Sequence, residues 1–262
     1  MSNDWLTDYF ERIHFEGSVE LSLDTLRALH TAHVFHVPFE NLDIHMGRQI
    51  QLDSESLINK IVYQRRGGYC FEMNGLFSLV LETMGFKVDR LLARIWRDYV
   101  TPRPRTHQVS LIHIDGQAWL ADVGYGAHCL HTPLLLKPDY SERQFTEHFR
   151  IMKDDSPEFL LQGEIQDEWK NFYSFPLEPY RPLDYVPVNY YTSTSPDSHF
   201  TQRRAIAMST PNGRITMVNE TVKVVANGIE TETVATTLDE YVEMLERYFG
   251  IVLSAQQITF PA

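Results

Sequence analysis

The chain has 262 residues, of which 43% are hydrophobic and 22% charged, and its formal net charge is -12 at pH 7. This length supports one large domain or two to three small ones, and the acidic balance argues against a general binder of nucleic acid or anionic membrane. The amino terminus lacks the features of a signal peptide, no apolar run approaches the roughly 20 residues of a membrane span, and only Cys70 and Cys129 carry thiols. We therefore expect a cytoplasmic protein without a disulfide framework.

Residues 1–85 are predicted to be mainly helical. One helical pattern opens at Asp53 and stops at Gly67–Gly68, and another runs from Cys70 until Gly85 ends it. The cysteine should therefore occupy the first turn of a largely buried helix, where free N–H groups and the helix dipole favour a thiolate over a thiol. The alternative is a buried cysteine that behaves as a small hydrophobic residue.

The next part of the chain is predicted to form strands, and its clearest feature is a hairpin at Asp115–Gly116. A two-residue loop fixes the register and places Val109 opposite Asp122. His107, two residues before Val109, then lies on the same face, diagonal to Asp122 and within reach of a hydrogen bond. A bulge would instead put the histidine and the aspartate on opposite faces.

The remaining segments are less regular. We expect a basic, proline-rich link at 97–105, irregular connections with weak strands up to about residue 190, and strands again from 200 to 234. A capping box at Thr237–Glu240 opens a final helix. The sequence thus predicts three domains: a helical one at 1–85 with the cysteine, a β-rich one at 86–190 with the histidine and aspartate, and a lid at 191–262.

Cys70, His107 and Asp122 have the residue types of a thiol catalytic unit. Cysteine suits acyl transfer from a thioester, because a thiolate is strongly nucleophilic at modest basicity. His107 would take the thiol proton, and Asp122 would fix the imidazole tautomer and support the imidazolium. The alternatives are a strand histidine that packs against its neighbours and a strand-end acid that bonds local backbone.

The segment Arg66–Asn74, which reads RGGYCFEMN, resembles the active-site signature of the arylamine N-acetyltransferases. Val37–Leu42 and Asp122–Gly126 are similar to further motifs of that family, and the order cysteine, histidine, aspartate matches. The similarity runs from about Trp5 to Phe249 and so covers nearly the whole chain.

The resemblance implies an α+β fold with an N-terminal helical bundle, a central β-barrel-like domain and a C-terminal α/β lid around a papain- or transglutaminase-like Cys-His-Asp core. It also implies a ping-pong reaction. Cys70 takes the acetyl group of acetyl-CoA, and the nitrogen of an arylamine or arylhydrazine, or the oxygen of an N-hydroxyarylamine, accepts it. Acetyl-CoA is then a co-substrate, no cofactor is permanently bound, and the protein is a monomer or homodimer without nucleic-acid or membrane partners.

The same resemblance implies roles for further residues. The backbone N–H groups of Cys70 and Gln108 would stabilise an oxyanion. Three aromatic residues would form the wall of the acceptor pocket: Phe39, Tyr125 and Phe200. Three residues that follow the aspartate would contact CoA: Gly124, Gly126 and Ala127. Ala127 stands where bacterial members commonly have a second glycine, and the carboxyl end is shorter than in many relatives, so the CoA cleft is expected to differ. Arg66 with Glu40 or Asn41 is expected to be a structural bridge.

Two other functions are compatible with these residues. One is a Cys-His-Asp hydrolase or amidase, which shares the helix-borne cysteine and hairpin-borne histidine, and the other is a non-catalytic binding protein with the same pocket. A zinc site at His128, Cys129 and His131 is rejected, because the sequence offers no further spaced ligands.

Overall fold

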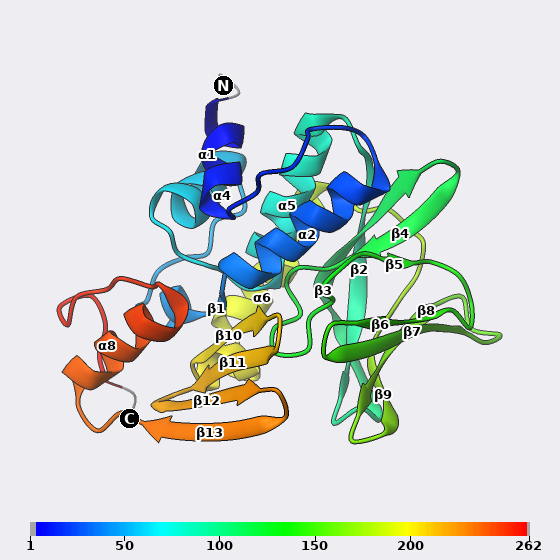
Figure 1. Cartoon of the computed structure of the whole chain (residues 1–262). Helices are drawn as coiled ribbons and strands as arrows, with labels where there is room; N and C mark the ends of the chain where they lie inside the picture. Colours follow the sequence, from blue (N-terminus) through cyan, green and yellow to red (C-terminus); the bar gives the residue numbers. More distant parts are fainter. Residues whose placement is uncertain (1–3, 261–262) are drawn as a thin grey trace.

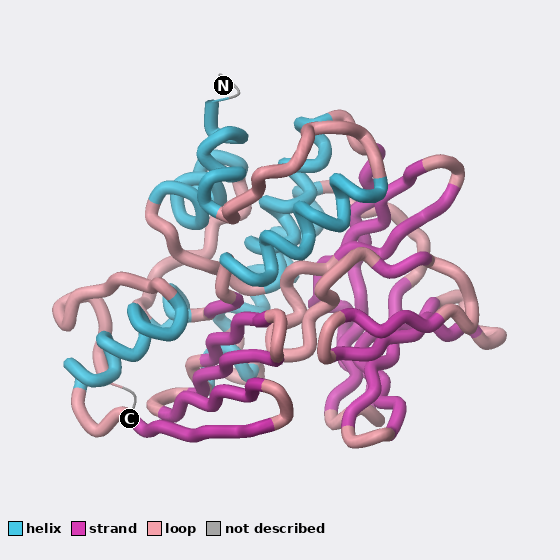
Figure 2. Tube along the Cα trace, in the orientation of Figure 1, coloured by secondary structure: helices cyan, strands magenta, loops and turns pink. Residues whose placement is uncertain are grey.

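The computed structural model describes residues 4–260, which form a helical part and two sheets whose paired strands run antiparallel (Figure 1). Residues 1–3, which belong to the segment considered for a leader peptide, and residues 261–262 lie outside the described part. Figure 2 shows most of the helices gathered beside the larger sheet, with the smaller sheet below them. The α and π helices are α1 (Asp4–Arg12), α2 (Leu23–His36), α3 (Leu42–His45), α4 (Ser54–Ile58), η1 (Asn59–Tyr63), α5 (Cys70–Met84), α6 (Tyr185–Thr194), α7 (His199–Gln202) and α8 (Leu238–Phe249).

Helix α5 is the centre of the helical part. It begins at Cys70, as predicted, and ends at Gly85, whose φ of 100° is the left-handed value that glycine tolerates. Its apolar side packs with α1, α2 and α4 into one core, which Ile112 on β3 and Trp119 on β4 complete. The start of α5 is therefore fixed against the larger sheet.

The larger sheet has the strand order β5-β4-β3-β2-β9-β8-β7-β6 and curves like an incomplete barrel (Figure 1). The predicted α+β fold with a barrel-like centre is confirmed. The register predicted for the β3–β4 hairpin is also confirmed, because Ile114 pairs with Gln117 and Ser110 with Ala121. The strands are β2 (Lys87–Arg97), β3 (Thr101–Ile114), β4 (Gln117–Ala121), β5 (Leu134–Leu135), β6 (Ser141–Gln144), β7 (Glu147–Lys153), β8 (Phe159–Ile165) and β9 (Glu168–Phe175).

The expected link at 97–105 is wrong in part, because its second half is the beginning of strand β3. Pro102 and Pro104 are tolerated there for a physical reason. Strand β4 pairs with β3 only from Ser110 onward, so the first half of β3 has a free side on which a missing N–H costs no ladder bond. The pairing with β2 is also irregular near Arg94.

The smaller sheet has the order β1-β10-β11-β12-β13 and is covered by α8, with Tyr241 and Leu245 among the buried residues between them. Its last hairpin turns at Asn227–Gly228, as predicted, with both residues at positive φ. Thr237 caps α8 by accepting the N–H of Glu240. The strands are β1 (Phe39–Glu40), β10 (Ala205–Thr210), β11 (Gly213–Val218), β12 (Thr221–Ala226) and β13 (Ile229–Val234).

Two elements between the sheets differ from the sequence prediction. Phe200 was expected on a strand but lies on the short helix α7, because the Ser198 side chain accepts the N–H of Phe200 and starts a helical turn. Helix α6 was expected as irregular chain. It follows a short 3₁₀ turn at Pro182–Asp184, and its buried face consists of Tyr185, Asn189 and Thr192.

Candidate active site

The structure brings Cys70, His107 and Asp122 together. Cys70 is the first residue of α5, His107 lies on β3, and Asp122 follows the last residue of β4. The hairpin register places His107 Nε2 2.7 Å from Asp122 Oδ2, with 3% and 0% of the two side chains exposed. The Cys70 sulfur lies 3.7 Å from the carbonyl oxygen of Thr106 and contacts the His107 imidazole.

The electrostatics of the histidine–aspartate pair favour its charged form. Burial opposes the charge on His107 and is the largest single effect, but the charge and hydrogen bond of Asp122, together with Cys70, outweigh it and raise the pKa of His107 to about 10. Burial likewise opposes ionisation of Asp122, yet His107 and the other donors hold the pKa of that carboxyl below its usual value. With Nε2 of His107 bound to Asp122, Nδ1 is the ring nitrogen that remains to exchange a proton with the sulfur.

Asn74 connects all three elements of this site. It lies one helical turn after Cys70, and its Nδ2 donates to Asp122 Oδ1 at 2.9 Å and to the Gln108 carbonyl at 2.7 Å. Its Oδ1 accepts the Val123 N–H at 2.9 Å. Asn74 belongs to the family motif, but the motif alone assigns it no role; its spacing of four residues from the cysteine is the signal in the sequence that points to one.

The glycine after Val123 explains how the aspartate segment approaches the cysteine helix. A Cβ atom on Gly124 would stand 2.9 Å from Cys70 Cα and 2.9 Å from Asn74 Nδ2, so only glycine fits there. Gly124 therefore packs against the nucleophile's own backbone. Gly126 has a φ of +97° and faces the Phe39 ring, and Ala127 packs in the same apolar cluster as Phe39 and Cys70.

The predicted aromatic residues belong to different clusters around the site. Phe39 and Phe200 are 6.0 Å apart between ring centroids and share a cluster with Cys70. Tyr125 contacts the His107 ring at 5.7 Å and stacks on Phe172 at 5.1 Å. Phe39 and Phe200 thus belong to the cluster that contains Cys70, whereas Tyr125 packs against the imidazole.

The two predicted oxyanion donors lie on different elements of the site, the start of α5 and strand β3. The N–H of Cys70 belongs to the first turn of α5 and so has no acceptor within the helix. Gln108 follows His107 on β3, and its carbonyl accepts from Asn74. The Gln108 Nε2 is buried and has no hydrogen-bond partner within residues 4–260.

A buried ion cluster lies beneath the start of α5. Arg66 donates to Glu40 Oε1 through Nη2 at 2.6 Å and through Nε at 3.0 Å, which confirms the expected structural bridge. Lys60 on η1 lies 2.7 Å from both Asp43 and Glu72. Glu72 also accepts the N–H of the capping residue of α5 at 3.1 Å. Burial raises the pKa of Glu72 to about 7 against the opposing charge of Lys60, which fits three carboxyl groups held by two cations.

The rejected zinc ligands contact other groups. His128 Nδ1 lies 3.1 Å from Glu147 Oε2, and Cys129 Sγ donates to the Asp122 carbonyl at 3.0 Å. Within the described part of the chain, no three His, Cys, Asp or Glu side chains are arranged to hold a metal ion. Among residues 4–260, none of the helices has the length and apolar character that a membrane span requires.

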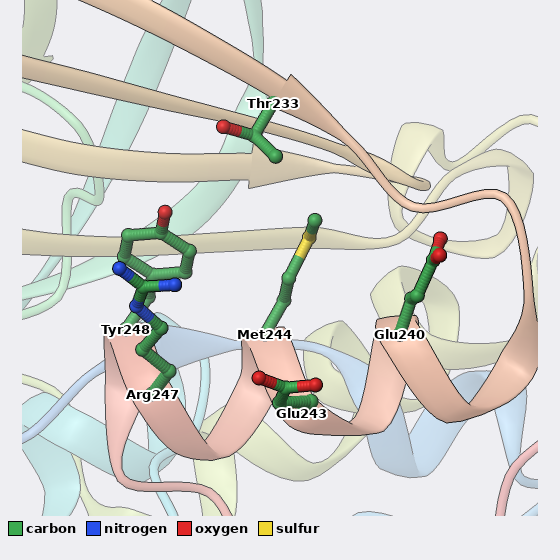
Figure 3. Close-up of a pocket in the computed structure, with 6 residues that line it drawn as sticks. All are labelled: Thr233, Glu240, Glu243, Met244, Arg247 and Tyr248. Carbon is green, nitrogen blue, oxygen red and sulfur yellow. The ribbon is translucent and has the colours of Figure 1, made fainter.

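A separate hollow lies on the surface between β13 and α8, where Met244 and Tyr248 face Thr233 (Figure 3). Glu240, Glu243 and Arg247 complete its lining. None of these residues belongs to the predicted site.

Comparison with known proteins supports a single family. An N-acetyltransferase family model matches residues 22–258, which include all three central side chains. The arylamine N-acetyltransferase of Escherichia coli (strain K12) is 38% identical over 216 residues, or 82% of this chain and 76% of that protein. The structure of arylamine N-acetyltransferase from Salmonella typhimurium matches with a TM-score of 0.92 and 31% identity over 97% of this chain and 96% of that one. The Mycobacterium marinum arylamine N-acetyltransferase in complex with CoA matches with a TM-score of 0.87 and 33% identity over 94% and 92%.

Proposed function

This chain belongs to the arylamine N-acetyltransferase family, and on that premise we propose that it transfers the acetyl group of acetyl-CoA to the nitrogen of arylamines and arylhydrazines through an acetyl-cysteine at Cys70. The oxygen of N-hydroxyarylamines is a second acceptor in this proposal. The observation that carries it is the Cys70–His107–Asp122 arrangement, in which a buried imidazole is held by a carboxylate on one nitrogen and contacts the thiol. Such a unit supplies a nucleophile and a proton carrier for acyl transfer.

In the first half-reaction, His107 Nδ1 holds the proton of the Cys70 thiol, and the thiolate attacks the carbonyl carbon of the acetyl thioester. The bond between that carbon and the CoA sulfur breaks. The departing CoA sulfur takes the proton from the imidazolium, which Asp122 supports through Nε2. The Cys70 N–H, at the start of α5, is oriented to stabilise the tetrahedral oxyanion, and Gln108 N–H is the second proposed donor.

In the second half-reaction, the acceptor nitrogen attacks the acetyl-cysteine carbon. His107 takes a proton from the nitrogen, the bond between carbon and Cys70 sulfur breaks, and the thiolate–imidazolium pair is restored. Phe39 and Phe200 form an apolar wall beside the sulfur. Such a wall favours a flat neutral aromatic amine over a charged alkylamine, whose desolvation is costly. Tyr125 acts from the imidazole side, and Gly124, Gly126 and Ala127 remain the proposed CoA contacts.

Acetyl-CoA acts as a co-substrate in this proposal, and no cofactor is permanently bound. The acidic net charge of -12 supports a protein without nucleic-acid or anionic-membrane partners. A cytoplasmic location and a monomeric or homodimeric state are part of the same proposal. The division into domains at 1–85, 86–190 and 191–262 is part of the same proposal. It is supported by the larger sheet having a core of its own and by the packing of the smaller sheet against α8, although the helical core also includes residues of β3 and β4.

Intact mass spectrometry tests the function directly. Incubation with acetyl-CoA alone should add one acetyl group to the wild-type chain and none to Cys70→Ala, and an added arylamine should remove the adduct while free CoA accumulates. Cys129→Ala is a poor control because Cys129 bonds Asp122, so Ser56→Ala, at a half-buried position of α4 outside the site, serves instead. An adduct that water removes as fast as the amine does would identify a hydrolase, and no adduct at all would identify a binding protein.

A further inference from the structure

The main chain of Asp122 lies beyond the end of its strand. Strand β4 and its pairing with β3 both stop at Ala121. The carboxylate nevertheless requires a fixed direction, because Oδ2 meets His107 and Oδ1 accepts from Asn74 and from the Gly124 N–H, both at 2.9 Å. The peptide groups on either side of Asp122 are instead held by hydrogen bonds to two side chains from outside the hairpin.

The first of these side chains is His30, on helix α2. The Asp122 N–H donates to His30 Nε2 at 3.2 Å. A backbone N–H can only donate, so Nε2 must be the unprotonated nitrogen. The ring proton is then on Nδ1, which lies 3.2 Å from the His131 carbonyl oxygen and donates to it. Both ring nitrogens are thus used, and their partners fix one neutral tautomer.

The surroundings of His30 keep that tautomer. The side chain is fully buried, and its ring packs edge-on against Phe77 of α5 with centroids 5.5 Å apart. Burial lowers the pKa of His30 to about 4, with the charge of Asp122 opposing this only in part. A neutral His30 leaves His107 as the cation that pairs with the carboxylate.

The second side chain is Cys129, which lies in the loop after the site. Its Sγ donates to the Asp122 carbonyl oxygen at 3.0 Å, and the residue is 3% exposed. Burial raises the pKa of the Cys129 thiol well above its usual value, so the sulfur keeps the proton that it donates. One peptide group of Asp122 is therefore held by a histidine acceptor and the other by a thiol donor.

We propose that His30 and Cys129 are positioning residues for the catalytic aspartate: they hold the main chain of Asp122 in a clamp where the β-ladder ends and thereby aim its carboxylate at His107 Nε2. This inference rests on the proposed function for its catalytic consequence, whereas the clamp itself is a matter of structure. Neither residue touches the sulfur or a substrate in this scheme. Each acts through Asp122 on the orientation of His107.

Two pairs of variants separate the hydrogen bonds from simple packing. His30→Leu removes both ring nitrogens, whereas His30→Gln keeps an acceptor for the Asp122 N–H and a donor for the His131 carbonyl. Cys129→Ala removes the donor, and Cys129→Ser keeps one. His113→Leu is the matched histidine control. His113 lies further along β3, is partly exposed, and bonds Asp89 on β2 instead of a residue of the site.

Three measurements are made on each full-length variant: amide exchange at Asp122, the NMR signal of the His107 ring proton on Nε2, and the rate of acetyl transfer to Cys70. We expect His30→Leu and Cys129→Ala to speed amide exchange and to shift or broaden the ring-proton signal. They should slow acylation by on the order of 10²-fold and tenfold respectively, the cost of a misplaced catalytic group, while Gln and Ser stay within about threefold of wild type. His113→Leu should match wild type throughout.

An unchanged ring-proton signal and acylation rate in folded His30→Leu or Cys129→Ala would overturn the clamp. So would Gln and Ser variants that are as impaired as Leu and Ala, because hydrogen bonding would then not be the cause. If His30→Leu does not fold, the His30→Gln variant and the Cys129 pair decide by the same criteria. A wild-type protein that takes no acetyl group but shows the expected exchange and NMR pattern would refute the proposed function and leave the clamp standing.

Discussion

Gly124 lies so close to Cys70 that a side chain on the glycine would meet the backbone of the nucleophile: an added Cβ would stand 2.9 Å from Cys70 Cα and 3.3 Å from its carbonyl oxygen. Backbone atoms cannot move aside as a flexible side chain does. The segment that carries Asp122 and the helix that carries the sulfur are therefore in direct van der Waals contact, and the geometry of the site depends on the absence of a side chain at Gly124.

Gly124→Ala should separate these two segments. We expect the free energy of unfolding to fall by about 1–3 kcal/mol, the usual cost of overpacking, and the acylation rate to fall on the order of 10²-fold as the carboxylate and sulfur move apart. Gly75→Ala, on the same helix, is the control, because its Cβ would meet only the end of the Leu57 side chain at 3.3 Å. Thermal unfolding and single-turnover acylation measure both effects, and equal behaviour of the two variants would contradict the expected contact.

Asp122→Asn should abolish most activity while keeping the fold. Asn74 and the Gly124 N–H both donate to Oδ1, so the amide oxygen takes that place and the NH₂ group faces His107 Nε2. The imidazole must then carry its proton on Nδ1 and present it to Cys70, which is the wrong tautomer for accepting the thiol proton. A loss of about 10⁴-fold in turnover is expected, by analogy with the serine-protease triad. Circular dichroism checks the fold, and near wild-type turnover would refute the proposed role of the aspartate.

The sequence was sufficient for the parts of the site that local rules determine. A two-residue Asp-Gly loop allows one register, and that register alone placed His107 beside Asp122. Glycines before Cys70 and the helical pattern after it located the start of α5. In each case the controlling interactions lie within a few residues along the chain.

The parts that the sequence did not predict depend on packing between distant segments. His30 reaches Asp122 from a helix 92 positions away in sequence, and no periodicity on α2 distinguishes it from His33, which bonds Tyr9 instead. Cys129 was considered only as a metal ligand, because a thiol that donates to a backbone carbonyl has no sequence signature. The apolar pattern around Phe200 predicts a strand, but in the structure one capping serine outweighs that pattern and starts a helical turn.

Arg66→Gln should destabilise the protein strongly. It leaves Glu40 buried without its bidentate partner, while Lys60 lies 3.8 Å from Glu40 and is already bound to two other carboxylates. A loss of about 3–5 kcal/mol in the free energy of unfolding is expected for a broken buried pair. Arg90→Gln also breaks two hydrogen bonds to one carboxylate, that of the exposed Glu82, and should cost less than about 1 kcal/mol. Urea denaturation of both variants gives the comparison, and similar losses would show that burial of the pair is not what matters.

Glu72 should give the stability a pH dependence near neutrality. The pKa of Glu72 is raised to about 7 by burial, so the folded state holds a proton that the unfolded state releases near pH 4.5. The stabilising contribution of this proton is therefore complete below about pH 4.5 and is lost as pH rises through about 7, with a slope of at most about 1.4 kcal/mol per pH unit.

Glu72→Gln removes this titration and keeps an oxygen acceptor for the Tyr69 N–H. Denaturation from pH 4 to 8 measures the free energy of unfolding of both proteins. As pH rises, this free energy should fall for wild type relative to the Gln variant. A difference that stays constant across this range would mean that Glu72 is ionised throughout.

Phe200 and Tyr125 should affect the two half-reactions differently, because Phe200 packs in the cluster that contains Cys70, whereas Tyr125 packs against the His107 ring. Phe200 packs beside Phe39 and Tyr69, at 6.0 and 5.7 Å between centroids, in the cluster that contains Cys70. Phe200→Ala should raise the KM for an arylamine and lower its kcat/KM by about tenfold or more, the value of one aromatic side chain buried against substrate. Acylation by acetyl-CoA alone should be unchanged.

Tyr125→Leu removes the ring that supports His107 and should slow both half-reactions, since both pass a proton through that imidazole. Single-turnover acylation and arylamine-dependent CoA release separate the steps. Equal slowing of acylation by both variants would place Phe200 in the shared machinery and contradict its role as an acceptor wall.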